Sequence, residues 1–262
     1  MTFTANARDT ARIIKNDLAE HLGRLRASTN SLSGDERALV AQLRRDGYVV
    51  VPGYWSREKA LAMRDRVEKY LEIGESRDFD SGAYLRFRDN VAYDEGVRRL
   101  YHVDKEIPEL AEHRNDPMIM RVVAGYYGRP YHSAVLMYQY NTRSNANTRY
   151  HHVDAFSKEF KSFVYLDDVD DGNGPFAYIP GTQRSHVKRV VKQLREGSNA
   201  TGFSPEELQR TIDREVRLTG EAGTLILADV RGFHRGTPQL DRSRSVLVNY
   251  LYAEPGEIQL ER

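Results

Sequence analysis

The sequence contains no cysteine. This absence excludes disulfides, a thiolate nucleophile, and zinc or iron–sulfur centres held by cysteine. Any metal chemistry in this chain must therefore use histidine, aspartate and glutamate side chains.

An excess of charge of either sign is also absent, since 39 lysine and arginine residues face 38 aspartate and glutamate residues. Without a broad cationic field we expect no binding to nucleic acid or to an anionic membrane surface. Any charged ligand must be bound locally, which favours a small-molecule substrate as the partner.

Long apolar runs are missing as well, because no segment approaches the length that a membrane-spanning helix needs. The first residues carry charges with no apolar core between them, unlike a secretory signal: Arg8, Asp9, Arg12 and Lys15. These features predict a cytoplasmic protein.

The first third of the chain is predicted to be mainly helical. Within residues 33–47, Ser33 is a plausible N-cap, Glu36 occupies the capping-box position and Gly47 ends the helix. An extended segment over residues 48–55 follows, and Ser56 caps a further helix. An earlier helix is indicated by leucines at helical spacing, Leu18, Leu22 and Leu25. In the helix after Ser56 the predicted buried face consists of Ala60, Met63, Val67 and Leu71.

After Gly74 the pattern changes to short β-rich runs separated by Gly, Pro, Asn and Asp. These runs are "AYLRFRD", "SAVLMYQYN", "KSFVYLDDV", "GTLILADV" and "SVLVNYLYAE". Two segments are predicted to be helical instead, residues 116–128 and 204–218. We therefore expect one mainly β domain over residues 1–262, with a helical part over about 1–75 packed on a sandwich or barrel over about 76–262 and an insertion near 187–218.

The segment "TRYHHVDAF" contains the first candidate metal ligands. On an extended strand side chains alternate between faces, so His152 and Asp154 point to the same side while His151 and Val153 point away. An H-x-D pair of this kind can offer an imidazole and a carboxylate to one ion. His151 is then a bystander.

A third ligand is needed to hold a catalytic metal, and "ADVRGFHRGTP" supplies His234. Two histidines and one carboxylate on one face of a metal leave the opposite positions open, as in non-haem Fe(II) oxygenases. Taken alone, each motif has a simpler explanation: H-x-D can lie on a surface strand, and His234 can be a turn histidine between Gly232 and Gly236. Joined in this order to "GPFAYIPGTQRSH" and to the arginine-containing strand that follows His234, the two motifs favour a metal site.

Two arginines, Arg242 and Arg244, lead into the apolar strand "SVLVNYLY". A guanidinium forms a planar, two-pronged contact with a carboxylate and stays charged even when buried. The distal carboxylate of 2-oxoglutarate fits such a contact, so either arginine is a candidate for binding this cosubstrate.

These segments, in this order, resemble the phytanoyl-CoA dioxygenase-like family of Fe(II)- and 2-oxoglutarate-dependent oxygenases, over most of the chain. The segments that carry the resemblance are "LRRDGYVVVPGYWSREKALAMRDRVEKYL", "YHHVDAF", "VYLDDVDDGNGPFAYIPGTQRSH", "GEAGTLILADVRGFHRG" and "RSVLVNY". Two positions depart from the family pattern: His151 stands where a tryptophan is common, and Thr182 replaces the usual serine of the "IPGSH" signature.

The resemblance implies a double-stranded β-helix, which is the jelly-roll or cupin-like architecture. It implies Fe(II) held by His152, Asp154 and His234, with Arg244 binding 2-oxoglutarate and O2 as the oxidant. Arg242 stays as an alternative, because Arg244 lies ten residues after His234 where many relatives have one residue more.

The resemblance also bears on the reaction. Halogenating relatives have glycine or alanine at the carboxylate position, so Asp154 favours hydroxylation of a small metabolite in a biosynthetic or tailoring pathway. Desaturation, ring closure or epimerisation can follow from the same hydrogen abstraction. Two rival functions are a cupin-type metal-binding protein and a non-redox isomerase or hydrolase that uses zinc or manganese.

Substrate contacts are predicted from three residues. Arg86 and Arg88 share a strand face with Tyr84 and could bind an acidic or phosphorylated group, although an exposed edge strand whose charges prevent further pairing explains them equally well. Phe156, close to the H-x-D pair, is a further candidate.

The other motifs have structural explanations. His186 is predicted to close the turn of "IPGTQRSH". The acidic loop "LDDVDDGNG" resembles part of a calcium loop at Asp168, Asp170 and Gly172, but it lacks the closing glutamate and the flanking helices, so a solvated turn is expected.

Overall fold

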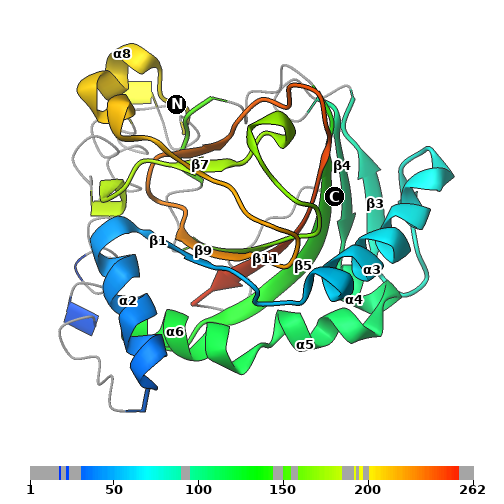
Figure 1. The fold of residues 1–262 in the computed structure, drawn as a ribbon, viewed down its shortest axis with the longest axis horizontal. Coiled ribbons are helices and arrows are strands. Elements are labelled where there is room, and N and C mark those ends of the chain that lie inside the picture. The colour runs from blue at the N-terminus through cyan, green and yellow to red at the C-terminus, as the bar shows by residue number, and fades with distance from the viewer. Residues whose placement is uncertain are drawn as a thin grey trace.

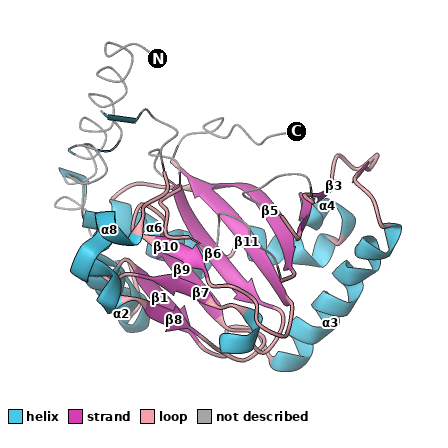
Figure 2. Ribbon diagram, turned by 90° about the horizontal axis from the view of Figure 1, so that it is seen from above, coloured by secondary structure: helices cyan, strands magenta, loops and turns pink. Residues whose placement is uncertain are grey.

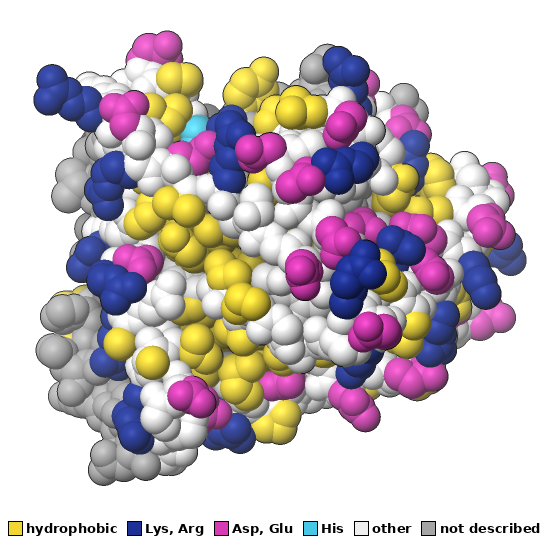
Figure 3. All heavy atoms as spheres, in the orientation of Figure 1, with side chains coloured by type: hydrophobic (Ala, Val, Ile, Leu, Met, Phe, Trp, Pro, Cys, Tyr) yellow, Lys and Arg dark blue, Asp and Glu magenta, His cyan; other side chains and the backbone are white. Residues whose placement is uncertain are grey.

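The computed structural model describes residues 31–89, 95–143, 150–154, 159–184 and 201–253, together with 18, 22, 23, 192, 195 and 196. The helix expected around Leu18 to Leu25 lies mostly outside these residues, and Phe156 and His186 lie outside them. Within the described part of the chain, no helix is long and apolar enough to cross a bilayer. Acidic and basic side chains are interspersed over the face shown in Figure 3, in line with their nearly equal numbers.

Most helices of the described chain follow one outer side of a large sheet (Figure 1). They are α2 (Gly34–Asp46), α3 (Arg57–Glu68), α4 (Val103–Glu106), α5 (Ala111–Arg114) and α6 (Pro117–Tyr127), with α8 (Pro205–Leu208) elsewhere. Short 3-10 turns are η1 (Lys69–Ile73), η2 (Pro108–Leu110), η4 (Asp171–Asn173), η5 (Thr182–Arg184) and η6 (Gln209–Arg214).

The helix predicted from the capping pattern is confirmed as α2. The Ser33 hydroxyl accepts from the Glu36 amide at 3.1 Å, and the Glu36 carboxylate accepts from the Ser33 amide at 2.9 Å. Gly47 ends the helix with a φ of 88°, a left-handed conformation that glycine adopts without strain. The expected extended segment follows as β1 (Tyr48–Val51), and Ser56 caps α3 as predicted.

The strands form two antiparallel sheets (Figure 2). The eight-stranded sheet has the order β1-β9-β6-β11-β5-β4-β3-β2, and the three-stranded sheet has the order β10-β7-β8. The strands of the large sheet are β1, β2 (Arg77–Asp78), β3 (Tyr84–Phe87), β4 (Val97–Tyr101), β5 (His132–Asn141), β6 (Glu159–Tyr165), β9 (Leu225–Asp229) and β11 (Arg244–Tyr252). Those of the small sheet are β7 (Phe176–Tyr178), β8 (Val216–Leu218) and β10 (His234–Gly236).

Except for the short, exposed β2, each strand of the large sheet has one face toward the helices and one toward the small sheet. On β11, Leu247 and Leu251 belong to the apolar cluster that includes the helices, whereas Val246 and Val248 pack with Phe176 of β7. This alternation follows from the two-residue period of a strand. The two sheets therefore face each other across this second cluster, and the side chains that point between them can be read from strand position. The predicted jelly-roll fold is confirmed.

The helix predicted over residues 204–218 is only partly correct. The α-helical part stops at Leu208, because Gln209 adopts a φ of 50°, and a 3-10 turn follows as far as Arg214. The end of the segment forms strand β8, which pairs with β7. Pairing with a neighbouring strand has overridden the local helical pattern, which is a weak determinant by itself.

Candidate metal centre

The segments that carry the two predicted histidine ligands are neighbours in the structure. The His152 amide donates to the His234 carbonyl at 2.9 Å, and the His234 amide donates to the His152 carbonyl at 3.0 Å. The Asp154 amide donates to the Val230 carbonyl at 3.1 Å, just before the turn that leads to His234. Backbone pairing therefore brings together residues that lie about eighty positions apart in the sequence.

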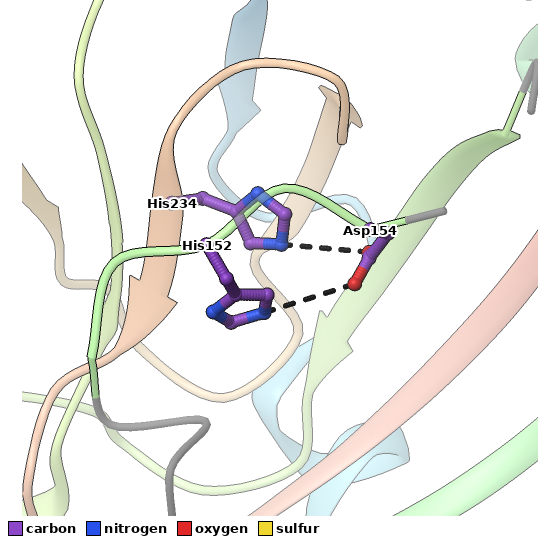
Figure 4. A group of neighbouring side chains, drawn as sticks. All are labelled: His152, Asp154 and His234. Atoms are coloured by element: carbon purple, nitrogen blue, oxygen red, sulfur yellow. Dashed lines mark ion pairs between the residues drawn. The ribbon is translucent and has the colours of Figure 1, made fainter. Parts of the chain in front are cut away.

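The side chains of His152, Asp154 and His234 converge on one point (Figure 4). One ligand atom from each lies within 4.8 Å of the others. His152 Nε2 is 3.7 Å from Asp154 Oδ1, and His234 Nε2 is 3.4 Å from Asp154 Oδ2. Two imidazole nitrogens and one carboxylate around a common centre form a donor set that fits a divalent transition metal.

Both imidazoles are oriented through the nitrogen that faces away from this centre. His152 Nδ1 lies 2.9 Å from the Tyr150 carbonyl, and His234 Nδ1 lies 2.9 Å from the Gly232 carbonyl. A carbonyl only accepts, so each Nδ1 carries the proton and each Nε2 presents its lone pair to the centre. Histidine ligands of metals are commonly oriented in this way.

The electrostatic environment favours the metal-binding protonation states. Burial lowers the pKa of His152 to about 4, and the neighbouring His234 adds to the effect. Burial alone would raise the pKa of Asp154, but Lys161 and the two histidines outweigh it and lower this pKa well below its ordinary value. His152 is therefore neutral and Asp154 ionised at neutral pH, as metal binding requires.

Lys161 is a member of the site that the sequence did not predict. Its Nζ lies 2.6 Å from Asp154 Oδ2 and 2.9 Å from Glu159 Oε1. The ammonium also lies 4.2 Å from the ring centre of Tyr250, and Tyr252 donates to Glu159 at 2.6 Å. The sequence feature that could have predicted this role is a lysine at an inward-facing position of an apolar strand, since a buried ammonium needs carboxylate partners.

The two candidate arginines have different environments. Arg244 is buried, and it shares the inner face of β11 with Val246 and Val248. Its guanidinium donates to the Gly174 carbonyl, and its Nε makes no hydrogen bond within the described residues. Burial lowers the pKa of Arg244, yet an arginine stays charged at neutral pH. Arg242 is half exposed and pairs with Asp170 at 2.6 Å, so its charge is neutralised at the surface.

Arg86 lies on β3 between β2 and β4, so β3 is not an edge strand. Its guanidinium lies 4.7 Å from the ring centre of Tyr84 and pairs with Asp78 at 2.7 Å. Tyr84 itself stacks on Tyr101, with 4.6 Å between the ring centres. Arg88 follows the strand, and its amide donates to the Val97 carbonyl at 3.1 Å. Strand alternation puts Arg86 on the same inner face as Tyr84.

The bystander His151 faces away from the centre, as strand alternation predicts. Its Nε2 lies 2.5 Å from Glu215 Oε2. Burial alone would raise the pKa of Glu215, but His151 and Arg235 outweigh it and lower this pKa to about 2. His151 therefore contacts the Glu215 carboxylate and not the metal centre.

The acidic loop shows no calcium-type cluster. Asp168 pairs with Arg57 at 2.6 Å, and Asp170 caps the turn η4 and pairs with Arg242. Within the described residues, His152, Asp154 and His234 form the single group of metal-ligating side chains.

Comparison with known proteins agrees with this fold. The family model described as Phytanoyl-CoA dioxygenase (PhyH) matches residues 43–245, which is most of the chain and includes both histidines, Asp154 and Arg244. The chain belongs to the phytanoyl-CoA dioxygenase family. No curated protein matches it in sequence.

Solved structures similar to this phytanoyl-CoA dioxygenase family member share its fold at low sequence identity. EctD from S. alaskensis, solved with 2-oxoglutarate and 5-hydroxyectoine, has a TM-score of 0.64 and 18% identity, over 87% of this chain and 79% of that one. The epimerase SnoN from nogalamycin biosynthesis has a TM-score of 0.58 and 16% identity, over 86% of this chain and 88% of that one. HygX from Streptomyces hygroscopicus was solved with nickel, 2-oxoglutarate and hygromycin B. It has a TM-score of 0.57 and 14% identity, over 88% of this chain and 90% of that one.

Proposed function

We propose that this protein is an Fe(II)- and 2-oxoglutarate-dependent dioxygenase that oxidises an unactivated C–H bond of a small metabolite. The observation that carries the proposal is the convergence of His152, Asp154 and His234 within 4.8 Å, inside the jelly roll of a phytanoyl-CoA dioxygenase family member. The similar structures support it, because EctD and HygX were solved with 2-oxoglutarate and SnoN with Fe3+ and alpha ketoglutarate.

His152 and His234 would bind iron through Nε2 and Asp154 through its carboxylate. When bound, iron with 2-oxoglutarate and O2 supplies the oxidant that removes hydrogen from the substrate. The protein keeps the two imidazoles oriented through their Nδ1 hydrogen bonds and keeps Asp154 ionised through Lys161. Three ligands on one side leave positions open for the cosubstrate.

Arg244 would bind the distal carboxylate of 2-oxoglutarate. Three observations support it over Arg242: it is buried, it lies on the inner face of β11, and its contacts leave the Nε donor unused by the described residues. A buried guanidinium with an unused donor is suited to a carboxylate ligand. Arg242 already pairs with Asp170.

The substrate would bind where Arg86 and Tyr84 line the inner face of β3, with Arg88 and Phe156 as further candidate contacts. We propose hydroxylation as the outcome, because Asp154 occupies the position that halogenating relatives leave without a carboxylate. Selectivity would depend on holding one carbon near the metal, since the oxidant attacks the hydrogen within reach. The similar structures come partly from nogalamycin biosynthesis, which favours a tailoring role here.

Anaerobic addition of Fe(II) and 2-oxoglutarate tests the proposal. We expect a weak visible metal-to-ligand charge-transfer band that requires both components. A cupin-type metal-binding protein or a zinc or manganese isomerase would bind the metal without this band, and that result would replace the oxygenase proposal. A screen of metabolites for oxygen consumption and succinate release would then identify the substrate.

A further inference from the structure

The segments that carry the two histidine ligands also share a partner on their opposite side. His152 and His234 face the metal centre, whereas the adjacent His151 and Arg235 both contact Glu215. His151 Nε2 lies 2.5 Å from Glu215 Oε2, and Arg235 donates to Oε2 and Oε1 at 2.7 Å each. The three side chains are only 5%, 12% and 22% exposed for His151, Glu215 and Arg235 respectively.

Apolar packing reinforces this contact from the same side. Val153, between two ligands, and Phe233, just before the third, belong to a buried cluster with Phe203 and Leu208. The rings of Phe203 and Phe233 are 4.6 Å apart. Backbone hydrogen bonds join the same segments, since the Phe203 amide donates to His151 at 2.8 Å.

The described residues 201–215 therefore pack behind the metal-binding segments. These contacts are made with the side chains that point away from the metal centre. Strand β10, which carries His234, has only three residues; it pairs with β7, and His234 also forms a single backbone bridge with His152. A strand this short gains limited rigidity from these backbone hydrogen bonds, so side-chain contacts to a shared partner add to what holds it in register with His152.

We propose that Glu215 is a positioning residue of the metal centre, which holds the His152 and His234 segments at the separation that metal binding needs. The inference rests on the proposed function to the extent that the triad binds a metal. An ionised carboxylate that accepts three charge-assisted or imidazole hydrogen bonds in a buried environment forms strong and geometrically restrictive contacts. When a group that orients metal ligands without binding the metal itself is removed, the metal affinity commonly falls by about 10- to 100-fold.

The test is Co(II) titration of the metal-free full-length chain, followed by its visible d–d absorption. We expect Glu215→Gln, which matches the size of glutamate but loses its charge, and Glu215→Ala to weaken Co(II) binding by about tenfold or more. The d–d spectrum should also change, because the separation of the two imidazoles is no longer restrained. His151→Gln keeps a donor toward Glu215 and should bind Co(II) like the unaltered chain, whereas His151→Leu should resemble Glu215→Gln.

Glu109→Gln is the control, because Glu109 also forms a two-pronged pair with an arginine, Arg66 at 3.0 and 3.1 Å, but on α3 and η2 and not on the segments that carry the triad. It should leave the Co(II) affinity and the spectrum unchanged. Thermal unfolding of each metal-free variant shows whether it is folded at the temperature of the titration. Unchanged Co(II) binding in both Glu215 variants would overturn the role of Glu215 alone. Absence of Co(II) binding by the unaltered chain would overturn the metal centre itself.

Discussion

The ammonium of Lys161 lies 2.6 Å from Oδ2 of Asp154, the carboxylate that completes the His152 and His234 donor set. This contact joins a candidate metal ligand to a buried network that continues through Glu159 to Tyr252. Because Lys161 occupies one carboxylate oxygen, it restricts how Asp154 can rotate toward a metal. The lysine therefore contributes to the geometry of the site as well as to its charge.

Lys161→Met should lower the affinity for Fe(II) or Co(II) by about 10- to 100-fold, because Asp154 loses the contact that orients it. Stability should also fall, since Glu159 would stay buried without its cation. Metal titration and urea unfolding measure the two effects separately. Lys192→Met is a suitable control, because Lys192 also pairs with two carboxylates, Glu196 and Glu207. If both variants lost metal affinity equally, Lys161 would have no specific role.

His152→Ala and His234→Ala should each abolish 2-oxoglutarate-dependent oxygen consumption. Two remaining ligands hold Fe(II) poorly and leave its coordination geometry undefined. An oxygen electrode with iron and 2-oxoglutarate supplied measures the effect. His132→Ala, at an exposed position of β5, should retain the full rate. Turnover at the unaltered rate in either ligand variant would remove that histidine from the donor set.

Arg244→Ala should raise the KM for 2-oxoglutarate by at least about 30-fold, because removal of a buried charged partner costs about 2 kcal/mol or more. Arg242→Ala should change the KM little, since the pair with Asp170 is exposed and screened by solvent. Succinate release at varied 2-oxoglutarate concentration gives both constants. The opposite ranking would assign the cosubstrate contact to Arg242.

Stability should decrease as the pH falls from about 6.5 toward 4, partly because of His113. Burial lowers the pKa of His113 to about 4, and its Nε2 is buried without a hydrogen-bond partner in the described chain. Between the two pKa values the unfolded chain binds the proton and the folded chain does not, so acid favours unfolding. Above the pKa that His113 has in the unfolded chain, neither state binds this proton, so the titration of His113 no longer lowers the stability of the folded protein.

His113→Asn keeps an amide nitrogen near the Tyr54 hydroxyl, which lies 3.0 Å from His113 Nδ1, but cannot titrate in this range. The loss of unfolding free energy between pH 7 and pH 5 should become smaller by about 2 kcal/mol. Urea unfolding of the metal-free chain at both pH values measures it. An unchanged pH dependence would mean that His113 is already protonated in the folded protein.

Much of the fold was predictable because its signals are local. The capping box at Ser33 and Glu36 and the left-handed glycine at Gly47 define α2 within a single segment. The apolar runs that became β5, β6, β9 and β11 have buried faces on both sides of the sheet, which their composition already indicated. Strand β4, with its two adjacent arginines, was not predicted, because only its pairing with β3 and β5 makes it a strand.

The predicted helix over residues 204–218 shows the limit of local signals. Its capping pattern at Ser204 and Glu207 is present in the structure, yet the helix ends after one turn. Val216 and Leu218 instead join the small sheet beside β7. A propensity of a few tenths of a kcal/mol per residue cannot compete with strand pairing and burial.

The sequence by itself determined which residue types could bind a metal and which of them share a face. The absence of cysteine left histidine and carboxylate ligands, and strand alternation separated His152 and Asp154 from His151. Only the tertiary structure decided that Arg244 is buried while Arg242 is exposed, that Lys161 contacts Asp154, and that Glu215 joins the two histidine segments. Alternation is a property of neighbouring residues, whereas burial, the contact between Lys161 and Asp154 and the pairing of His151 with Glu215 depend on how the two sheets and the insertion pack together.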